Sequence, residues 1–276
     1  MWAVLILHQS QRHKQILTRV KAICQDFHSQ SLLHLAAREG QIHHLRRLLD
    51  GDEQVNAETT DYSGKGQTPL MLAARFNDEE VIEFLIERGA SPEMEDYQHR
   101  TSFHYAAEGG KVRNVLRLIE RGVNVLQTDE SGYSALHLAA SNGHTNVVRL
   151  LIEHGADVNE VAHSSDNSGC TPVMLGAEKG HLRTVQVLLQ NEAYSNKGNG
   201  NTWLPLHSAA KGDHTEVLKF LLKRDGNVLA VTNLVTTVLH LATTLDLVMT
   251  PVDHGAKIQA RYLGILFICH TITIIT

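Results

Sequence analysis

Short apolar stretches alternate with polar segments along most of the chain, in a pattern that favours pairs of helices. Residues 134–140 read SALHLAA, a run of small and apolar residues, and a polar stretch with Gly143 follows. Val147 and Leu151 come next, at a spacing that puts them on one face of a second helix. A polar segment then begins at Gly155. The pattern therefore predicts two short helices followed by a polar loop.

The same seven-residue phrase recurs at nearly fixed intervals. Its copies begin at Ser31, Thr68, Thr101, Ser134, Thr171, Leu204 and Thr237. Successive starts are 33 residues apart, except for two steps of 37 residues. A repeat of this size cannot bury its apolar face alone, so its stability must come from stacking on its neighbours. We therefore expect one elongated array and no enclosed catalytic pocket.

Polar residues, prolines and glycines mark the ends of the predicted helices. A Ser or Thr at most starts can cap a helix N-terminus, and proline suits the first helical position at Pro69, Pro172 and Pro205. Glycine nine residues after a start predicts a turn with positive φ, at Gly40, Gly110, Gly143 and Gly180. Second helices are expected to end at Gly89, Gly122 and Gly155. The polar segments that follow, with Asp96 or Asp129, predict hairpin-like fingers.

On these residues the chain resembles the ankyrin-repeat family, most fully over 134–159, SALHLAASNGHTNVVRLLIEHGADVN. The resemblance implies an all-α fold, an α-solenoid of about seven repeats with fingers, over residues 29–261. Repeat 7 departs from the pattern because Pro251 falls where its second helix should run. Members of the family bind unrelated partners, so the implied function is a non-catalytic protein–protein interaction scaffold or adaptor that uses the concave groove and the fingers.

Both ends of the chain leave alternatives open. Residues 1–28 are expected to form a capping helix over repeat 1, or else a basic helix that binds a membrane surface or a partner. Residues 262–276, YLGILFICHTITIIT, are almost uncharged. They could form a packed end of the array, a degenerate eighth repeat, an aggregation-prone tail, or the start of a membrane segment. The last reading supports a second function: the cytosolic array of a membrane-associated protein such as a channel subunit, truncated near its membrane segment.

The composition of the chain mainly argues against certain classes of protein and of site. The net charge of −5 argues against a general nucleic-acid binder. Three widely separated cysteines, Cys24, Cys170 and Cys269, suggest neither a disulfide framework nor a zinc site. The apolar run at the N-terminus is short for a signal peptide. We therefore expect a cytoplasmic or nuclear protein that is not secreted.

The 18 histidines resemble a metal signal, but the repeat explains most of them. Five stand at the fourth position of the phrase, where the family resemblance implies a structural bond between adjacent repeats: His34, His104, His137, His207 and His240. No HExxH, nucleotide-binding glycine loop or catalytic triad spacing occurs. We expect no catalytic residues, cofactor or metal.

A stripe of residues on the expected concave face is the candidate partner-binding site. It combines residues just before repeat starts with residues at the ends of first helices: Arg100, Tyr133 and Trp203, and Arg75, Phe76, Asn142 and Lys179. Arg, Tyr and Trp are enriched where binding energy concentrates. The alternative for Trp203 is that it shields repeat 6.

The two steps of 37 residues place four extra residues in two fingers, 56–67 and 159–170. Loops tolerate insertion at little cost, so these fingers could reflect neutral drift or a grip on a partner. Asn159 lies in a context that, by resemblance, can be hydroxylated by an oxygenase. The alternative is an unmodified turn asparagine.

Overall fold

The computed structural model describes residues 31–51, 54–59, 66–162, 169–196, 198–199, 201–224, 226–241, 249 and 251. The expected capping helix over 1–28, the tail 262–276 and most of the second helix expected in repeat 7 lie outside these residues. The described residues contain no β-strand and only two isolated antiparallel bridges, Thr128 with Ser134 and Ala162 with Cys170. Both bridges lie in fingers, whose hairpin-like form is thereby confirmed.

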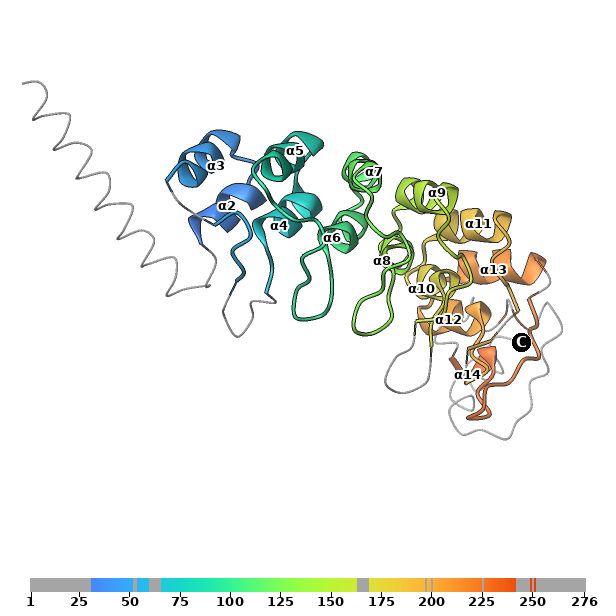
Figure 1. Cartoon of the computed structure of the whole chain (residues 1–276). Coiled ribbons are helices and arrows are strands. Elements are labelled where there is room, and N and C mark those ends of the chain that lie inside the picture. The colour runs from blue at the N-terminus through green and yellow to red at the C-terminus, as the bar shows by residue number, and fades with distance from the viewer. Residues whose placement is uncertain are drawn as a thin grey trace, which may run out of the picture. The chain divides into compact units, whose positions relative to one another are not determined.

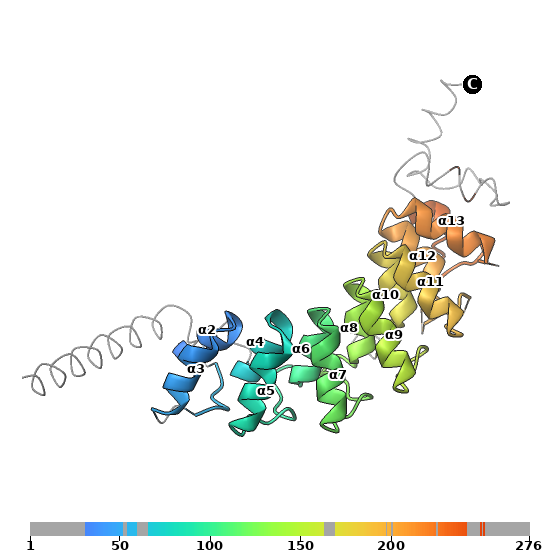
Figure 2. The same cartoon turned by 90° about the horizontal axis from the view of Figure 1, so that it is seen from above.

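The chain divides into two compact units, residues 1–123 and 124–276. In the first unit, first and second helices alternate as α2 (Leu32–Arg38), α3 (Ile42–Leu49), α4 (Pro69–Phe76), α5 (Glu79–Glu87), α6 (Ser102–Glu108) and α7 (Val112–Glu120). First helices pack on first helices, α2 on α4 and α4 on α6, and α5 packs on α7. Figures 1 and 2 show these two layers, with the fingers extending beyond the first helices.

The second unit repeats the arrangement. It contains α8 (Ala135–Ser141), α9 (Thr145–Glu153), α10 (Pro172–Glu178), α11 (Leu182–Gln190), α12 (Pro205–Lys211), α13 (Thr215–Lys223) and α14 (Val238–Leu241). The first helices α8, α10, α12 and α14 pack in sequence, as do the second helices α9, α11 and α13. Every first helix therefore begins one residue after an expected repeat start.

A histidine completes the cap of several first helices. Ser134, the N-cap of α8, is extended, with φ −83° and ψ 170°. Its backbone N–H donates to Nδ1 of His137 at 3.2 Å, and its Oγ lies 2.9 Å from the same atom. His34 and His104 make the same pair of contacts with Ser31 and Thr101. The imidazole therefore takes the role that Glu or Gln plays at the third helical position of a capping box.

The turns between helices follow the glycine pattern with two exceptions. Gly143 has φ +73°, and Gly40, Gly110 and Gly180 are alike. In repeat 6 Asp213 occupies this position and still adopts φ +61°. In repeat 2 Asn77 is extended instead, with φ −111°, and its side chain donates to the carbonyls of Ala37 and Arg38 at 2.7 Å each. A side-chain bond to the previous repeat thus accompanies the different turn.

The core consists of the apolar faces of the helices and small residues where first helices approach one another. Ala73, Ala74, Ala106 and Ala107 are completely buried in the first unit. At Gly109 a Cβ atom would collide with the carbonyl oxygen of Arg75 in the preceding repeat. Close stacking is therefore built into the small residues of the recurring phrase.

Candidate functional site

The C-terminal ends of the first helices are the part of those helices that reaches solvent. In α4, the residues from Pro69 to Ala74 are buried, whereas Arg75 is half-buried and Phe76 is 44% exposed. In five of the six other repeats the equivalent of Phe76 is polar or glycine, and in repeat 7 it is Leu245: the five are Glu39, Gly109, Asn142, Lys179 and Gly212. The fold therefore does not require an aromatic residue at this position.

Phe76 lies between two guanidinium groups in the first unit. The Cζ atom of Arg38, at the end of α2, lies 5.3 Å from the centroid of the Phe76 ring. That of Arg75 lies 5.4 Å from the same centroid. Arg75 also forms an ion pair of 3.1 Å with Glu108 at the end of α6. We call Arg38, Phe76 and Arg75 the Arg–Phe cluster; two of its members, Arg75 and Phe76, were predicted from the sequence.

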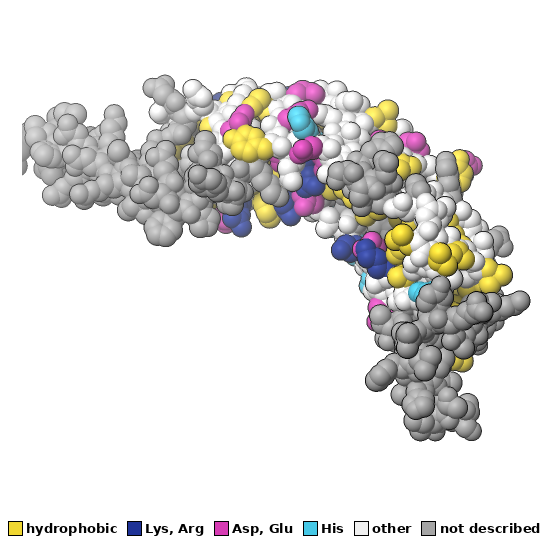
Figure 3. All heavy atoms as spheres, turned by 90° about the horizontal axis from the view of Figure 1, so that it is seen from below, with side chains coloured by type: hydrophobic (Ala, Val, Ile, Leu, Met, Phe, Trp, Pro, Cys, Tyr) yellow, Lys and Arg dark blue, Asp and Glu magenta, His cyan; other side chains and the backbone are white. Residues whose placement is uncertain are grey.

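In the second unit the first-helix ends are polar. Asn142 is exposed, and its Nδ2 donates to the carbonyl of Leu138 at 2.9 Å. Lys179 is exposed beside Glu178, whose carboxylate pairs with Lys211 at 3.0 Å. On the face shown in Figure 3, charged side chains of both signs lie among apolar ones. Asn142 and Lys179 are thus accessible, as a binding role needs, but no aromatic residue accompanies them there.

The finger turns are shaped by one recurring polar side chain. Asp96 Oδ1 accepts hydrogen bonds from the backbone N–H groups of Gln98 and Arg100, each at 2.9 Å. Asp129 does the same for Ser131 and Tyr133, at 3.0 and 2.9 Å. Asn199 repeats the pattern with Asn201 and Trp203. The predicted binding residues Arg100, Tyr133 and Trp203 therefore occupy the same place, at the end of a finger turn.

Tyr133 and Trp203 already have packing roles within their own repeats. The Tyr133 ring meets the His137 ring edge to face, with centroids 5.6 Å apart. The Trp203 ring lies 5.5 Å from that of His207, and its Nε1–H donates to Ser208 Oγ at 3.0 Å. Both residues are half-buried. Trp203 thus covers part of repeat 6, as the alternative interpretation of this residue proposed.

Tyr105 is a finger-linking residue that the sequence reasoning missed. It is 1% exposed, and its hydroxyl donates to Asp96 Oδ2 at 2.6 Å. The hydroxyl oxygen of Tyr105 also accepts a hydrogen bond from Gln67 Nε2 at 2.7 Å, so this one side chain joins two consecutive fingers. Burial and the bond to Asp96 raise the pKa of the Tyr105 hydroxyl, which therefore stays protonated. The available signal was a tyrosine at the fifth position of the phrase, which holds Leu in five of the six other repeats.

The fourth-position histidines bridge adjacent repeats. His34 Nε2 lies 2.9 Å from the carbonyl of Gln67, and His137 Nε2 lies 3.0 Å from that of Cys170. Since Nε2 faces a carbonyl, it carries the proton, and Nδ1 is the acceptor for the N-cap. Burial lowers the pKa of His137 to about 4. His207 is buried near the carbonyls of Ala230 and Thr236 but makes no Nε2 hydrogen bond of standard geometry.

Asn159 also connects two repeats. Its Nδ2 donates to the carbonyl of Glu192 at 3.1 Å, and its Oδ1 accepts from the backbone N–H of Tyr194 at 2.9 Å. Asn56 makes the equivalent bonds to Gly89 and Ser91 at 3.2 and 3.0 Å. Both amide groups are therefore used in inter-repeat bonding. The middle of the two long fingers, 60–65 and 163–168, lies outside the described residues.

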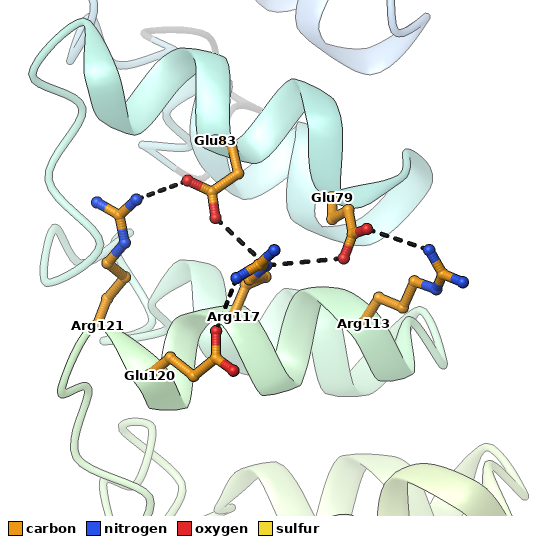
Figure 4. Close-up of polar contacts among 6 residues, drawn as sticks. All are labelled: Glu79, Glu83, Arg113, Arg117, Glu120 and Arg121. Carbon is orange, nitrogen blue, oxygen red and sulfur yellow. Dashed lines mark hydrogen bonds and ion pairs between the residues drawn. The ribbon is translucent and has the colours of Figure 1, made fainter.

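An ionic network joins the second helices α5 and α7 (Figure 4). Arg117 lies among three carboxylates, at 2.9 Å from Glu120, 3.4 Å from Glu83 and 3.7 Å from Glu79. Arg113 pairs with Glu79 at 3.1 Å, and Arg121 pairs with Glu83 at 2.6 Å. Three arginines and three glutamates balance in charge, which fits a stacking role better than recognition of a charged ligand.

In the described part of the chain, no group of three or more His, Cys, Asp or Glu side chains could hold a metal ion. No helix there is both long and apolar enough to cross a membrane.

Comparison with known proteins agrees with the repeat pattern. The family model for three ankyrin repeats matches residues 1–96, 33–129 and 103–199, and the single-repeat model matches 201–233. Human transient receptor potential cation channel subfamily A member 1 is 37% identical over 87 residues, 30% of this chain and 8% of the channel. Mouse NF-kappa-B inhibitor delta is 31% identical over 113 residues, 38% of this chain and 32% of the inhibitor. The matches thus span under a third of either relative.

Solved structures show the same fold. The human ASB11 ankyrin repeat domain superposes with a TM-score of 0.68 at 21% identity, over 83% of this chain and all of that one. The ankyrin repeat domain of Bcl-3, described as a member of the IkappaB protein family, gives a TM-score of 0.60 at 26% identity, over 81% and 98% of the two chains. The fold is an all-α solenoid. Its family models match most of its residues, so the chain belongs to the ankyrin-repeat family, whose repeats form protein–protein interaction domains.

Proposed function

We propose that this chain is a non-catalytic scaffold or adaptor that holds a protein partner on the exposed ends of its first helices and on its finger ends. The observation that carries this proposal is Phe76, 44% exposed between Arg38 and Arg75. An aromatic ring flanked by arginines has the composition at which interface binding energy concentrates.

The exposure of Phe76 costs free energy and brings no gain within the fold. Exposed aromatic surface gives up the free energy of burial, about 25 cal/mol per Å² of apolar area. Five of the six other repeats have a polar residue or glycine where Phe76 stands, and none has an aromatic residue there, so stacking does not demand the ring. Burial of Phe76 by a partner would recover this free energy. In the second unit, Asn142 and Lys179 are accessible at first-helix ends, whereas Tyr133 and Trp203 are partly engaged by His137 and His207.

Affinity purification tests the proposal. Tagged wild-type chain and the Phe76→Ala variant are used to isolate proteins from a native lysate, and bound proteins are quantified by mass spectrometry. A partner that depends on the first-helix ends should fall at least tenfold with Phe76→Ala. Tyr194→Ala is the matched control, because Tyr194 is 50% exposed and lies outside this surface. Equal recovery with both variants would place binding elsewhere, and circular dichroism verifies that each variant is folded.

A second candidate function is the cytosolic ankyrin array of a membrane channel. The similarity to the human cation channel, 37% identity over 87 residues, favours it. Sequencing of full-length transcripts tests it: an open reading frame that continues through several membrane segments supports this function. A stop codon directly after Thr276 in all transcripts would contradict it.

The proposed scaffold would act in the cytoplasm or nucleus. A fluorescent fusion of the full chain, followed by fractionation, tests this location. Recovery of the fusion from the secretory pathway would overturn it.

A further inference from the structure

We infer that the Arg–Phe cluster recognises a protein segment in which an acidic side chain stands beside an apolar one. This inference rests on the proposed partner-binding function and specifies the chemistry of the partner. The carboxylate would pair with Arg38, and the apolar side chain would cover the exposed face of Phe76.

Among the described residues, the charges along the first-helix ends leave Arg38 without a matching anion. The eighth position of the repeat holds Arg38, Arg75 and Glu108 in successive repeats of the first unit. Arg75 pairs with Glu108 at 3.1 Å, but Arg38 forms no ion pair with any residue in the described part of the chain. In the second unit the equivalent column is compensated, because Glu178 pairs with Lys211 at 3.0 Å.

The contact with Phe76 prepares Arg38 for such a ligand. Its Cζ lies 5.3 Å from the ring centroid, within the range of a cation–π interaction. A guanidinium that lies over a ring keeps in-plane N–H donors that fit a carboxylate in bidentate fashion. The ring also limits the positions that the long arginine side chain adopts, so less side-chain entropy is lost on binding.

A second arginine–phenylalanine arrangement in the same unit shows what the fold uses for packing alone. Phe84 lies between Arg46 and Arg88, at 5.5 and 5.1 Å from the two Cζ atoms. Its ring is only 9% exposed, against 44% for Phe76. Packing between repeats therefore buries the ring, and the open ring of Phe76 is the one available to a partner.

The surrounding charges favour a protein segment over a polyanion. Glu39 follows Arg38 directly and is exposed, and Glu108 holds the other guanidinium. The chain as a whole carries a net charge of −5. A nucleic acid would bring several phosphates toward these carboxylates, whereas a single Asp or Glu fits the one guanidinium of Arg38.

Selection from a random peptide library on the wild-type chain tests the inference. Twelve-residue display libraries present many combinations of an acidic and an apolar side chain on one segment, which is what a hot spot of this composition would select. Binders are counted against three variants of the full chain: Arg38→Gln, Phe76→Ala and Arg149→Gln. Arg149 is the control because it is exposed on the second helix α9, outside the proposed binding surface. We expect selected peptides to be enriched in Asp or Glu within two positions of an aromatic or aliphatic residue. Binding should fall at least tenfold with the first two variants and stay within twofold with Arg149→Gln, and it should weaken as NaCl rises.

Three outcomes would overturn the inference. If the selected peptides are not enriched in Asp or Glu, or if they bind the Arg38→Gln variant as tightly as the wild type, the Arg–Phe cluster does not recognise a carboxylate. The proposed partner-binding function would then still stand, but with its binding site elsewhere. Phosphopeptide or nucleic-acid probes that bind more tightly than the selected peptides would assign a different partner class. If no peptide binds the wild-type chain and affinity purification also yields no partner, the proposed function fails together with the inference.

Discussion

The Nε2 atom of His34 lies 2.9 Å from the carbonyl oxygen of Gln67, the residue 33 positions later. The distance from His137 to Cys170, again 33 residues later, is 3.0 Å. In both cases Nδ1 of the same imidazole serves the helix N-cap of its own repeat. One buried side chain thus joins the start of a helix to the finger end that precedes the next repeat, which couples local helix formation to stacking.

Replacement of this bridge should destabilise the chain. His137 is completely buried, so His137→Ala removes its hydrogen bonds and leaves a cavity, at a cost of about 3 kcal/mol. His240→Ala is the matched control at the exposed equivalent in repeat 7, and it should cost less than about 1 kcal/mol. Urea denaturation followed by circular dichroism measures both. Equal losses of stability in the two variants would mean that the contribution of this histidine to stability does not depend on its burial.

The free energy of unfolding should also decrease as the pH falls, because of His137. The pKa of His137 is lowered by burial to about 4, whereas an unfolded histidine titrates near 6.5. The unfolded state therefore binds the proton first, so stability is fully present above pH 6.5 and is lost as the pH falls from 6.5 to about 4. The loss from this group is on the order of 3 kcal/mol. Burial lowers the pKa of His181 and His207 as well, in the same direction.

Denaturation midpoints at pH 7, 6, 5 and 4.5 check this dependence. His137→Ala should start from a lower stability at pH 7 and decline less steeply toward pH 4.5 than the wild type. Parallel curves for the two proteins would show that His137 does not contribute the pH dependence.

The ionic network on α5 and α7 should contribute stability that salt removes. Arg117→Met keeps the aliphatic stem but deletes the guanidinium that meets Glu79, Glu83 and Glu120. We expect a lower urea midpoint in low salt and little difference from wild type in 1 M NaCl, where screening acts over about 3 Å. Lys219→Met, which breaks the single exposed pair with Glu216, should change the midpoint less. A loss that salt leaves unchanged would assign the effect to packing.

Val235 occupies a strained backbone conformation that a better residue could relieve. Its φ is +59°, in the left-handed region that costs an L-residue roughly 1–2 kcal/mol and suits β-branched residues poorly. The side chain is 59% exposed, so little burial is lost on substitution. Val235→Asn should therefore stabilise the chain by about 1 kcal/mol.

Gly132 provides the reciprocal test, because it stands at the same finger position with φ +77°. Gly132→Val should destabilise the chain, as measured by the thermal midpoint. If Val235→Asn lowers the thermal midpoint, packing of the Val235 side chain compensates the strain of its backbone.

Asn159 should contribute to stability through its amide. Asn159→Ala loses the bonds to Glu192 and Tyr194, and about 1–2 kcal/mol of stability with them. Asn56→Ala, which loses the equivalent bonds in the first unit, should cost a similar amount. A negligible loss at both positions would mean that water replaces these bonds on the surface.

We further propose hydroxylation of Asn159, on the basis of its sequence context. Mass spectrometry of the peptide that holds Asn159, from cells grown in normal oxygen, should show a fraction heavier by one oxygen atom. Asn56 serves as the internal comparison, since its amide makes equivalent bonds in the structure. Complete absence of the oxidised peptide would contradict the proposal.

The sequence by itself determined the repeat period, the helix starts and the turns. These features depend on local preferences: N-capping residues, proline at the first helical position and glycine at positive φ. Each acts within a few residues, so each is visible in the printed chain. The position of Gly143 predicted a positive φ, which is +73°. The family resemblance, not local preference, implied that the recurring histidine forms a bond between repeats, which His34 and His137 make.

Only the tertiary structure decided which side chains meet across repeats. Phe76 and Arg38 are 38 positions apart. Nothing local to either residue fixes the distance of 5.3 Å between the Phe76 ring centroid and Cζ of Arg38. The same holds for Tyr105, which reaches Gln67 in the previous repeat, and for Trp203, whose indole turns onto Ser208. Such contacts depend on how closely the helices stack and on the rotamers that packing leaves open, and both are properties of the folded array that no single repeat possesses.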